Sequence, residues 1–193
     1  MGKSKRMGLL IFLLALVVST PASAAAPTPA EVKQEKDEIR KKTKEILAQL
    51  YKAEPSAKAT IGKAAGYAVF SNFGMKIFVA GSGTGKGIAV SNKTKKEVFM
   101  KMIELQGGLG MGVKKFNLVW VFETPDKLDT FVNSGWEIGA QTSAAAKVGD
   151  KGGAYQGAMA VSPGIWLYQL TESGLALELT AKGTKYYKND ELN

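Results

Sequence analysis

GYAVFSNFGMKIFVAGSGTGKGIAVS, residues 66–91, is the stretch that decides the predicted fold. Its second half places a glycine at every second position, at Gly81, Gly83, Gly85 and Gly87. Alternate residues of a β-strand point to opposite faces of the sheet, so these glycines would leave one face of the strand without side chains. A phosphate, another stretch of backbone or a packed helix must therefore lie close against that bare face.

The sequence on either side of this stretch shows the period of two that is typical of strands. We expect strands at 67–71, 76–90, 98–113, 117–123, 136–142, 154–161, 165–170 and 175–180. The third of these repeats the glycine pattern at Gly108, Gly110 and Gly112, which predicts a second strand in one tightly packed layer. Residues 118–122 are apolar at every position, which predicts a central strand covered on both faces.

Three segments carry the start and stop patterns of helices. Residues 28–31 read Thr-Pro-Ala-Glu, a capping-box pattern that opens a helix running to about residue 52. A shorter helix is expected from Pro55 to Gly66, where the glycine would form a left-handed cap or a turn. Residues 124–134 begin with Thr-Pro-Asp and predict another helix. The pattern predicts an α+β fold: a twisted, mainly antiparallel, glycine-rich sheet, open or partly closed into a barrel, packed with two or three helices.

The first predicted helix is basic and amphipathic. At about 100° per residue, its apolar side carries a stripe that includes Ile39, Ile46 and Leu50. Basic side chains fall on the flank or the opposite side, at Lys33, Arg40, Lys41 and Lys44. In one interpretation the stripe packs on the sheet and the charged side chains are a solvated face, because acidic residues dilute the positive charge. In the other, the helix lies on a membrane surface.

The composition excludes several kinds of chemistry. The 193 residues contain no cysteine and no histidine, so we expect no Cys or His nucleophile, no imidazole base and no zinc site of the usual kind. Lysine and arginine number 26 against 17 acidic residues, for a formal net charge of +9. A basic balance suits anionic partners. We expect no cofactor, no metal and no catalytic residue.

The N-terminus has the pattern of a secretory signal peptide. Lys3, Lys5 and Arg6 precede an apolar run at 7–18, and Ala-Ser-Ala follows at 22–24. The run has 12 residues, fewer than the roughly 20 that cross a bilayer as a helix. We therefore expect residues 1–26 to be removed on export, leaving a periplasmic or extracellular protein. Export also argues against a nucleic-acid partner, although the basic charge would suit one.

Two enzyme-like patterns are weak. Residues 80–86 approach a phosphate-binding P-loop, but Gly87 stands where the hydroxyl that holds magnesium belongs. The residues after it continue as a strand instead of a helix, so we expect no nucleotide. Glu104 and Glu123 could form a carboxylate pair for glycoside hydrolysis, although nothing in the sequence brings them together.

Several blocks in the same order resemble the SYLF domain family. They are AAGYAVF at 64–70, the glycine-alternating strand with GKG at 85–87, GGLGMGV at 107–113, Tyr168 and GLALEL at 174–179. The resemblance covers roughly residues 55–193. It implies a lipid-binding domain without catalytic activity or cofactor, in which an N-terminal amphipathic helix contributes to lipid contact. Eukaryotic members bind phosphoinositides and some bind actin filaments, whereas bacterial members are often exported.

By its position, the helix in residues 27–54 corresponds to the lipid-contacting helix that this family uses. Phosphoinositides and actin are not expected outside a bacterial cytoplasm, so the resemblance implies a generic anionic phospholipid surface. We expect Lys33, Arg40, Lys41 and Lys44 to contact headgroups and Ile39, Ile46 and Leu50 to insert. Secondary basic candidates are Lys86, Lys93, Lys95 and Lys96. The alternative is a structural or protein-interaction domain of the envelope, in which the helix is part of the core.

Overall fold

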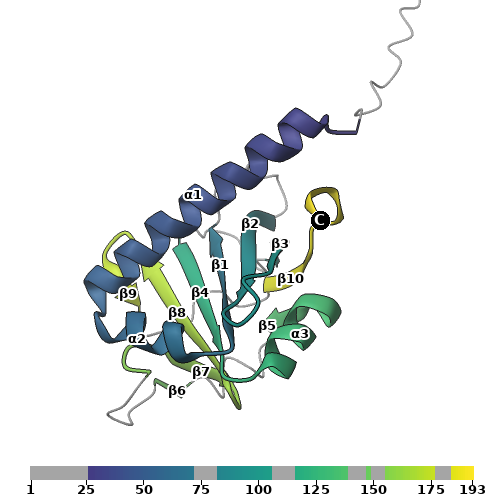
Figure 1. Ribbon diagram of the computed structural model, residues 1–193. Helices are drawn as coiled ribbons and strands as arrows, with labels where there is room; N and C mark the ends of the chain where they lie inside the picture. The colour runs from purple at the N-terminus through teal and green to yellow at the C-terminus, as the bar shows by residue number, and fades with distance from the viewer. Residues whose placement is uncertain (1–25, 72–81, 106–115, 139–146, 149–154, 177–183) are drawn as a thin grey trace, which may run out of the picture.

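The computed structural model describes residues 26–71, 82–105, 116–138, 147–148, 155–176 and 184–193 (Figure 1). Its helices are α1 (Pro29–Ala53), α2 (Ser56–Lys63), α3 (Pro125–Ser134) and a short 3-10 helix η1 (Asp190–Leu192). Its strands are β1 (Gly66–Ser71), β2 (Ser82–Ser91), β3 (Glu97–Leu105), β4 (Phe116–Phe122), β5 (Trp136–Ile138), β6 (Lys147–Val148), β7 (Met159–Ser162), β8 (Ile165–Thr171), β9 (Gly174–Ala176) and β10 (Thr184–Lys188).

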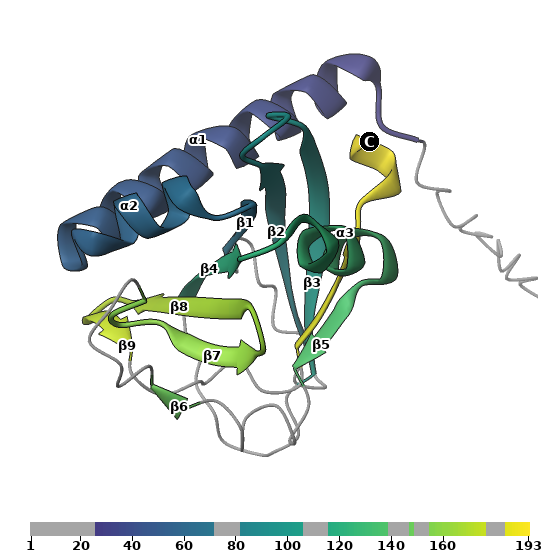
Figure 2. The same ribbon diagram turned by 60° about the horizontal axis from the view of Figure 1, so that its bottom comes forward.

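All ten described strands belong to one sheet. Their order is β5-β10-β3-β2-β1-β4-β8-β7-β6, with β9 beside β8, and each pairing between described strands is antiparallel. The sheet curls into a half-barrel, so that β5 and β7 approach the same side of the molecule (Figure 2). The predicted α+β fold, with a mainly antiparallel sheet and three helices, is confirmed.

The two faces of the sheet carry separate cores. The inner face of the curl packs against α3 through a large cluster that includes Trp120, Phe131 and Tyr186, each fully buried. On the outer face, α1 and α2 cover a second cluster that includes Ile46, Leu50 and Val69. The apolar run in β4 serves both cores because its alternate residues point to opposite faces, which confirms that it is a central strand.

The start of α1 follows the expected capping chemistry. At the start of α1, the Thr28 side chain accepts a hydrogen bond from the backbone N–H of Glu31, and the Glu31 carboxylate accepts one from the Thr28 N–H at 2.7 Å. This pair is the predicted capping box, and Pro29 occupies the first turn. Helix α3 also begins at a proline, Pro125, but the side chain of Thr124 before it forms no capping hydrogen bond. The helix ends at Ser134 and is followed by Gly135, whose positive φ of 74° favours glycine.

The bare glycine face of β2 lies against neighbouring strands. A Cβ on Gly85 would stand 2.6 Å from the backbone oxygen of Ser71, and one on Gly87 would overlap the Phe70 ring. Both neighbours lie in β1, so for these two glycines close packing against the adjacent strand is the correct account. Gly81 and the second glycine pattern at 108–112 lie outside the described residues.

Three local predictions differ from the structure. Gly66 is no helix cap, since α2 ends at Lys63 and Gly66 is the first residue of β1, paired with Ser91 and Phe122. The short strand β6 lies between the strands that we expected at 136–142 and 154–161, where none was predicted. Strand β10 lies beyond the last strand that we expected, at 175–180, and it pairs with both β3 and β5.

Candidate functional site

Helix α1 lies across the outer face of the sheet, with its apolar stripe turned inward (Figure 1). Ile46 and Leu50 are 1% and 0% exposed in the second core, which also contains Val69 of β1. Ile39 joins a third, smaller cluster that contains Phe99 of β3. The docked helix therefore keeps all three predicted inserting residues away from solvent.

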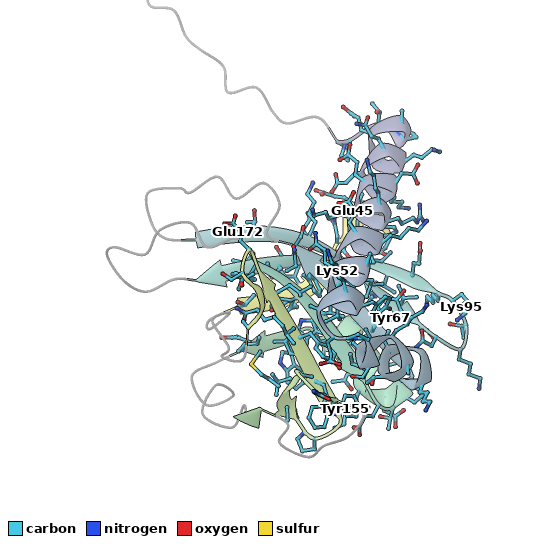
Figure 3. All side chains as sticks on the ribbon, turned by 90° about the vertical axis from the view of Figure 1, so that its left-hand side faces the viewer. Glu45, Lys52, Tyr67, Lys95, Tyr155 and Glu172 are labelled. Atoms are coloured by element: carbon cyan, nitrogen blue, oxygen red, sulfur yellow. The ribbon has the colours of Figure 1, made fainter. Side chains whose placement is uncertain are left out.

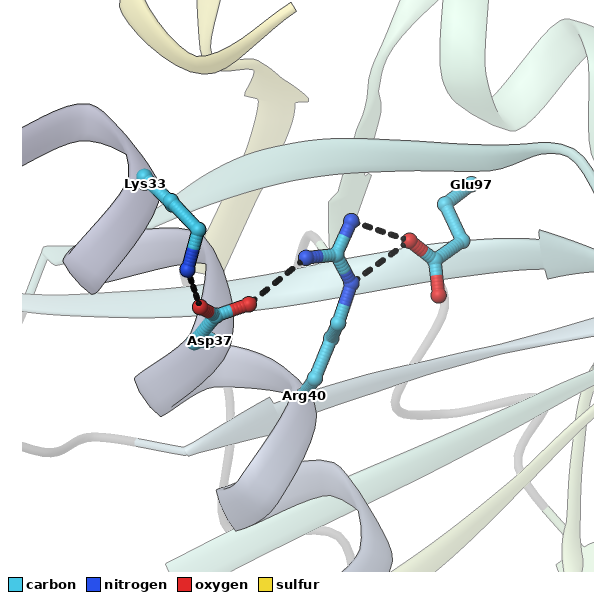
Figure 4. Close-up of polar contacts among 4 residues, drawn as sticks. All are labelled: Lys33, Asp37, Arg40 and Glu97. Carbon is cyan, nitrogen blue, oxygen red and sulfur yellow. Dashed lines mark hydrogen bonds and ion pairs between the residues drawn. The ribbon is translucent and has the colours of Figure 1, made fainter. Parts of the chain in front are cut away.

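The predicted basic residues Lys33 and Arg40 take part in an ion-pair network that ties α1 to the sheet (Figure 4). The Nε and one terminal nitrogen of Arg40 lie 2.8 Å from Oε2 of Glu97 in β3. The other terminal nitrogen lies 3.0 Å from Asp37, which also pairs with Lys33 at 2.9 Å. Arg40 thus connects the helix to a strand that is 57 residues away in the sequence.

The contacts favour the charged forms of Asp37 and Arg40. The hydrogen bond from Lys33, followed by that from Arg40, lowers the pKa of the Asp37 carboxyl below its usual range. The hydrogen bond to Glu97 raises the pKa of Arg40. The Arg40 guanidinium also lies over the Phe99 ring, 5.2 Å from its centroid, and adds a cation–π contact at the same place. Even so, exposed ion pairs contribute little to the stability of a fold.

Lys41 and Lys44 differ from the two basic residues of the network. Both are exposed, and neither forms an ion pair in the part of the chain that the structure describes. Helical geometry places them about 200° and 140° around the axis from Ile39, on the side of α1 that faces solvent. Lys52 lies on the same side and is also exposed. We call Lys41, Lys44 and Lys52 the outward lysines.

The secondary basic candidates lie in two places. Lys93, Lys95 and Lys96 are exposed in the turn between β2 and β3, and Lys95 has a positive φ of 59° (Figure 3). Asn92 ties this turn to α2, because its side-chain amide donates to the carbonyl oxygens of Ile61 and Ala64 at 2.6 and 2.8 Å.

The fourth secondary candidate, Lys86, lies in β2, away from the turn. It projects from the outer face of β2 toward α1, where its ammonium lies 2.8 Å from Glu35.

A groove of about 790 Å³ separates this part of the sheet from α1. Its helix side includes Glu45, labelled in Figure 3, and Ile46, and its sheet side includes Lys86 and Lys101. Its volume falls within the usual range of small-molecule sites.

Other kinds of site are not seen in the described residues. No cluster of three or more acidic side chains there could hold a metal ion. No described helix combines the length and the apolar character needed to cross a bilayer. Glu123 accepts a hydrogen bond from the Trp166 indole at 2.8 Å, and the side chain of Glu104 lies outside the described residues.

Sequence reasoning missed the partners of the basic residues. Glu97, Phe99 and Lys101 alternate along β3, so the strand period alone places them on one face. Nothing in the sequence indicates that this face meets α1. Lys52 could have been found from the helical period, which repeats Lys41, Lys44 and Lys52 on one side.

The fold and the groove define a class of protein: an antiparallel half-barrel with an amphipathic helix docked on its outer face. No family model matches the chain. The chain is 32% identical over 166 residues to Beta cell expansion factor A of Aeromonas veronii. The match covers 85% of this chain and 61% of that protein, so the chain spans less than two thirds of the length of its relative.

Proposed function

We propose that this protein is a non-catalytic member of the SYLF family that binds anionic phospholipid surfaces outside the cytoplasm. The observation that carries the proposal is the outward face of α1, where Lys41, Lys44 and Lys52 are exposed on one side of a helix that is anchored to a folded domain. A rigid row of cations can meet a flat anionic surface without any change in the fold.

The free energies involved favour a first contact with the membrane in which α1 stays docked on the sheet. Undocking α1 would expose Ile39, Ile46 and Leu50, and burial of each stabilises by about 1.5–3 kcal/mol. Each lysine near an anionic membrane contributes about 1 kcal/mol, which does not offset that loss. Insertion of the stripe is then a second step, in which the bilayer replaces the sheet as the apolar environment.

Vesicle co-sedimentation tests the proposal. The purified protein is mixed with anionic or neutral liposomes at two salt concentrations. We expect binding to anionic liposomes at low salt, and weaker binding at high salt because the contacts are screened. The double variant Lys41→Glu and Lys44→Glu should lose this binding and keep the fold.

A charge-matched control changes Lys127 in α3 and Lys188 in β10 to glutamate. Lys188 donates a hydrogen bond to Asn133 of α3, so both lysines belong to the α3 side of the molecule. This variant should bind anionic liposomes as well as the original protein. Equal loss in both double variants would mean that net charge alone decides binding, and no binding by the original protein would contradict the proposal.

A second candidate is an envelope domain that is structural or binds another protein. The nearly complete burial of Ile46 and Leu50 favours it, since a stripe that serves as core needs no lipid. The same experiment separates the two candidates. The structural role predicts that the protein with and without the two glutamates behaves alike with every liposome.

A further inference from the structure

A row of polar side chains crosses four neighbouring strands on the outer face of the sheet. In the strand registers, Ser71 of β1 lies beside Lys86 of β2, Lys86 beside Lys101 of β3, and Lys101 beside Tyr187 of β10. Adjacent strands are about 4.8 Å apart, so the row presents hydroxyl, ammonium, ammonium and hydroxyl groups in sequence. All four residues line the groove beside α1.

The two lysines at the centre of the row are an unfavourable pair for the sheet alone. Like charges directly opposite each other on neighbouring strands destabilise a sheet. Each lysine is balanced by a carboxylate from outside the sheet: Lys86 by Glu35 and Lys101 by Glu191, both at 2.8 Å. The side chains of Lys86 and Glu35 are 50% and 31% exposed, and those of Lys101 and Glu191 are 34% and 60% exposed. Ion pairs that are this exposed are weak, so neither glutamate is held tightly by its lysine.

The rest of the groove is amphipathic. Ile46 of α1 and Val69 of β1 line it beside the polar row, and both also belong to the second core. On the sheet side the charged lining residues are all cations, whereas the helix side carries both signs, including Glu38 and Lys41. An anionic group is therefore attracted to the sheet side, with an apolar wall next to it.

We propose that this groove binds an acidic single-chain amphiphile, whose oxyanion headgroup lies between Lys86 and Lys101. Ser71 and Tyr187 donate hydrogen bonds to the headgroup from either end of the row. The headgroup replaces Glu35 and Glu191 as counter-ion, and the chain extends along Ile46 and Val69. The shared chemistry is a phosphate or carboxylate next to an alkyl chain.

The arrangement favours an amphiphile over a free oxyanion. A free phosphate would have to displace two carboxylates and would gain no apolar contact in return. An alkyl chain adds the burial of apolar surface, which is the larger favourable contribution in pockets of this size. The groove lies beneath α1 and shares Lys41 with the outward lysines, but Lys86 and Lys101, which hold the headgroup, are not among them, so this inference does not depend on binding to vesicles.

The test uses dodecyl phosphate below its critical micelle concentration, with binding measured by calorimetry. We expect saturable binding that becomes about tenfold weaker, or is lost, in the double variant Lys86→Gln and Lys101→Gln, because each charged hydrogen bond is removed. The matched control Lys58→Gln and Lys63→Gln makes the same change of charge at two exposed positions of α2. It should bind dodecyl phosphate like the original protein.

Two further probes separate the headgroup from the chain. Inorganic phosphate alone and dodecyl maltoside alone should both bind far more weakly than dodecyl phosphate. Equal binding of inorganic phosphate would overturn the proposal that the ligand is an amphiphile. Equal binding of the maltoside, or unchanged binding in the Lys86→Gln and Lys101→Gln variant, would overturn the oxyanion site.

A second variant keeps the test decisive if the lysine variant does not fold. Thr84 lies on the outer face of β2 and lines the groove, and its side chain is exposed. The Thr84→Trp side chain should fill the groove and leave both lysines in place. Tryptophan also has a high propensity for strands, so β2 should be kept. We expect folded Thr84→Trp protein to lose dodecyl phosphate binding, and binding of unchanged strength would contradict the proposed site.

Discussion

Glycine alternation in β2 is a packing device at the scale of single residues. Gly85 and Gly87 bring β2 against β1 so closely that a Cβ at either position would meet backbone or a ring of the neighbouring strand. The alternation was visible in the sequence. The sequence argued against a phosphate, because Gly87 replaces the hydroxyl that holds magnesium. It did not show whether a neighbouring strand or a packed helix lies against the bare face.

Gly87→Ala should therefore destabilise the protein. The added methyl group would meet the Phe70 ring and the Val69 carbonyl, and overpacking of a core costs about 1–3 kcal/mol. Chemical denaturation of both proteins measures the difference in the free energy of unfolding.

Gly62→Ala is the matched control for this change. Gly62 lies in α2, and a Cβ there would have no neighbour within 4 Å. The substitution should be neutral or stabilise by up to about 1 kcal/mol, because alanine is the better helix former. Similar effects of the two substitutions would contradict the close-packing account of β2.

At the scale of elements, the main feature is how α1 is attached. Its C-terminal half is held by buried apolar contacts at Ile46 and Leu50, and its N-terminal half by Arg40, Phe99 and a smaller cluster. The two halves thus differ in the kind of contact that secures them. High salt should weaken the attachment of the N-terminal half and leave the C-terminal half almost unchanged.

A double-mutant cycle on Arg40 and Glu97 measures the polar attachment directly. With Arg40→Gln and Glu97→Gln, we expect a coupling energy of roughly 0.2–1 kcal/mol at low salt, because both side chains are more than a third exposed. The coupling should fall at high salt.

The same cycle on Lys44 and Glu97 is the control, since these two residues form no ion pair among the described contacts. A coupling energy as large as that of Arg40 and Glu97 would show that the effect is not specific to the contact.

How well the sequence predicted each element depended on local patterns. Helices α1 and α3 were recognised from their caps and first-turn prolines, which are features of consecutive residues. Strand β10 was missed because its exposed lysines resemble a polar tail. Its buried residues, Thr184 and Tyr186, do follow the strand period, but their partners in β3 and β5 are distant in the sequence.

The candidate site was less predictable than the fold. The stripe and the basic residues of α1 could be assigned to opposite sides from the helical period alone. That Lys86 and Lys101 stand side by side follows from the register of β2 and β3, which the polar turn between them makes predictable. That both lysines face α1 depends on how the helix crosses the sheet, which no local pattern specifies.

At the scale of the whole molecule, the two ends of the described chain meet. Leu192 packs with Ile39 and Phe99 in the third cluster, and the side chain of Asn193 bonds to the backbone of Phe99 in both directions, at 2.8 and 3.0 Å. The short helix η1 thus supports the strand on which the N-terminal half of α1 rests. Docking of α1 depends on residues from both ends.

Leu192→Ala should destabilise the protein by about 2–4 kcal/mol, since the leucine is 2% exposed and its loss leaves a cavity. Thermal and denaturant unfolding measure the change. In the Leu192→Ala protein we also expect hydrogen exchange to become faster in the N-terminal half of α1 than in its C-terminal half. An equal increase in both halves would contradict the proposed role of the third cluster.

The position of β10 has a consequence for the order in which the chain can fold during synthesis. β10 follows every other described strand in the sequence, yet it lies between β3 and β5. Until the ribosome has released it, β3 has an unpaired edge and the inner core lacks Tyr186. A growing chain therefore cannot complete its sheet before β10 has been made, and we expect it to stay open to chaperones and transport machinery until then.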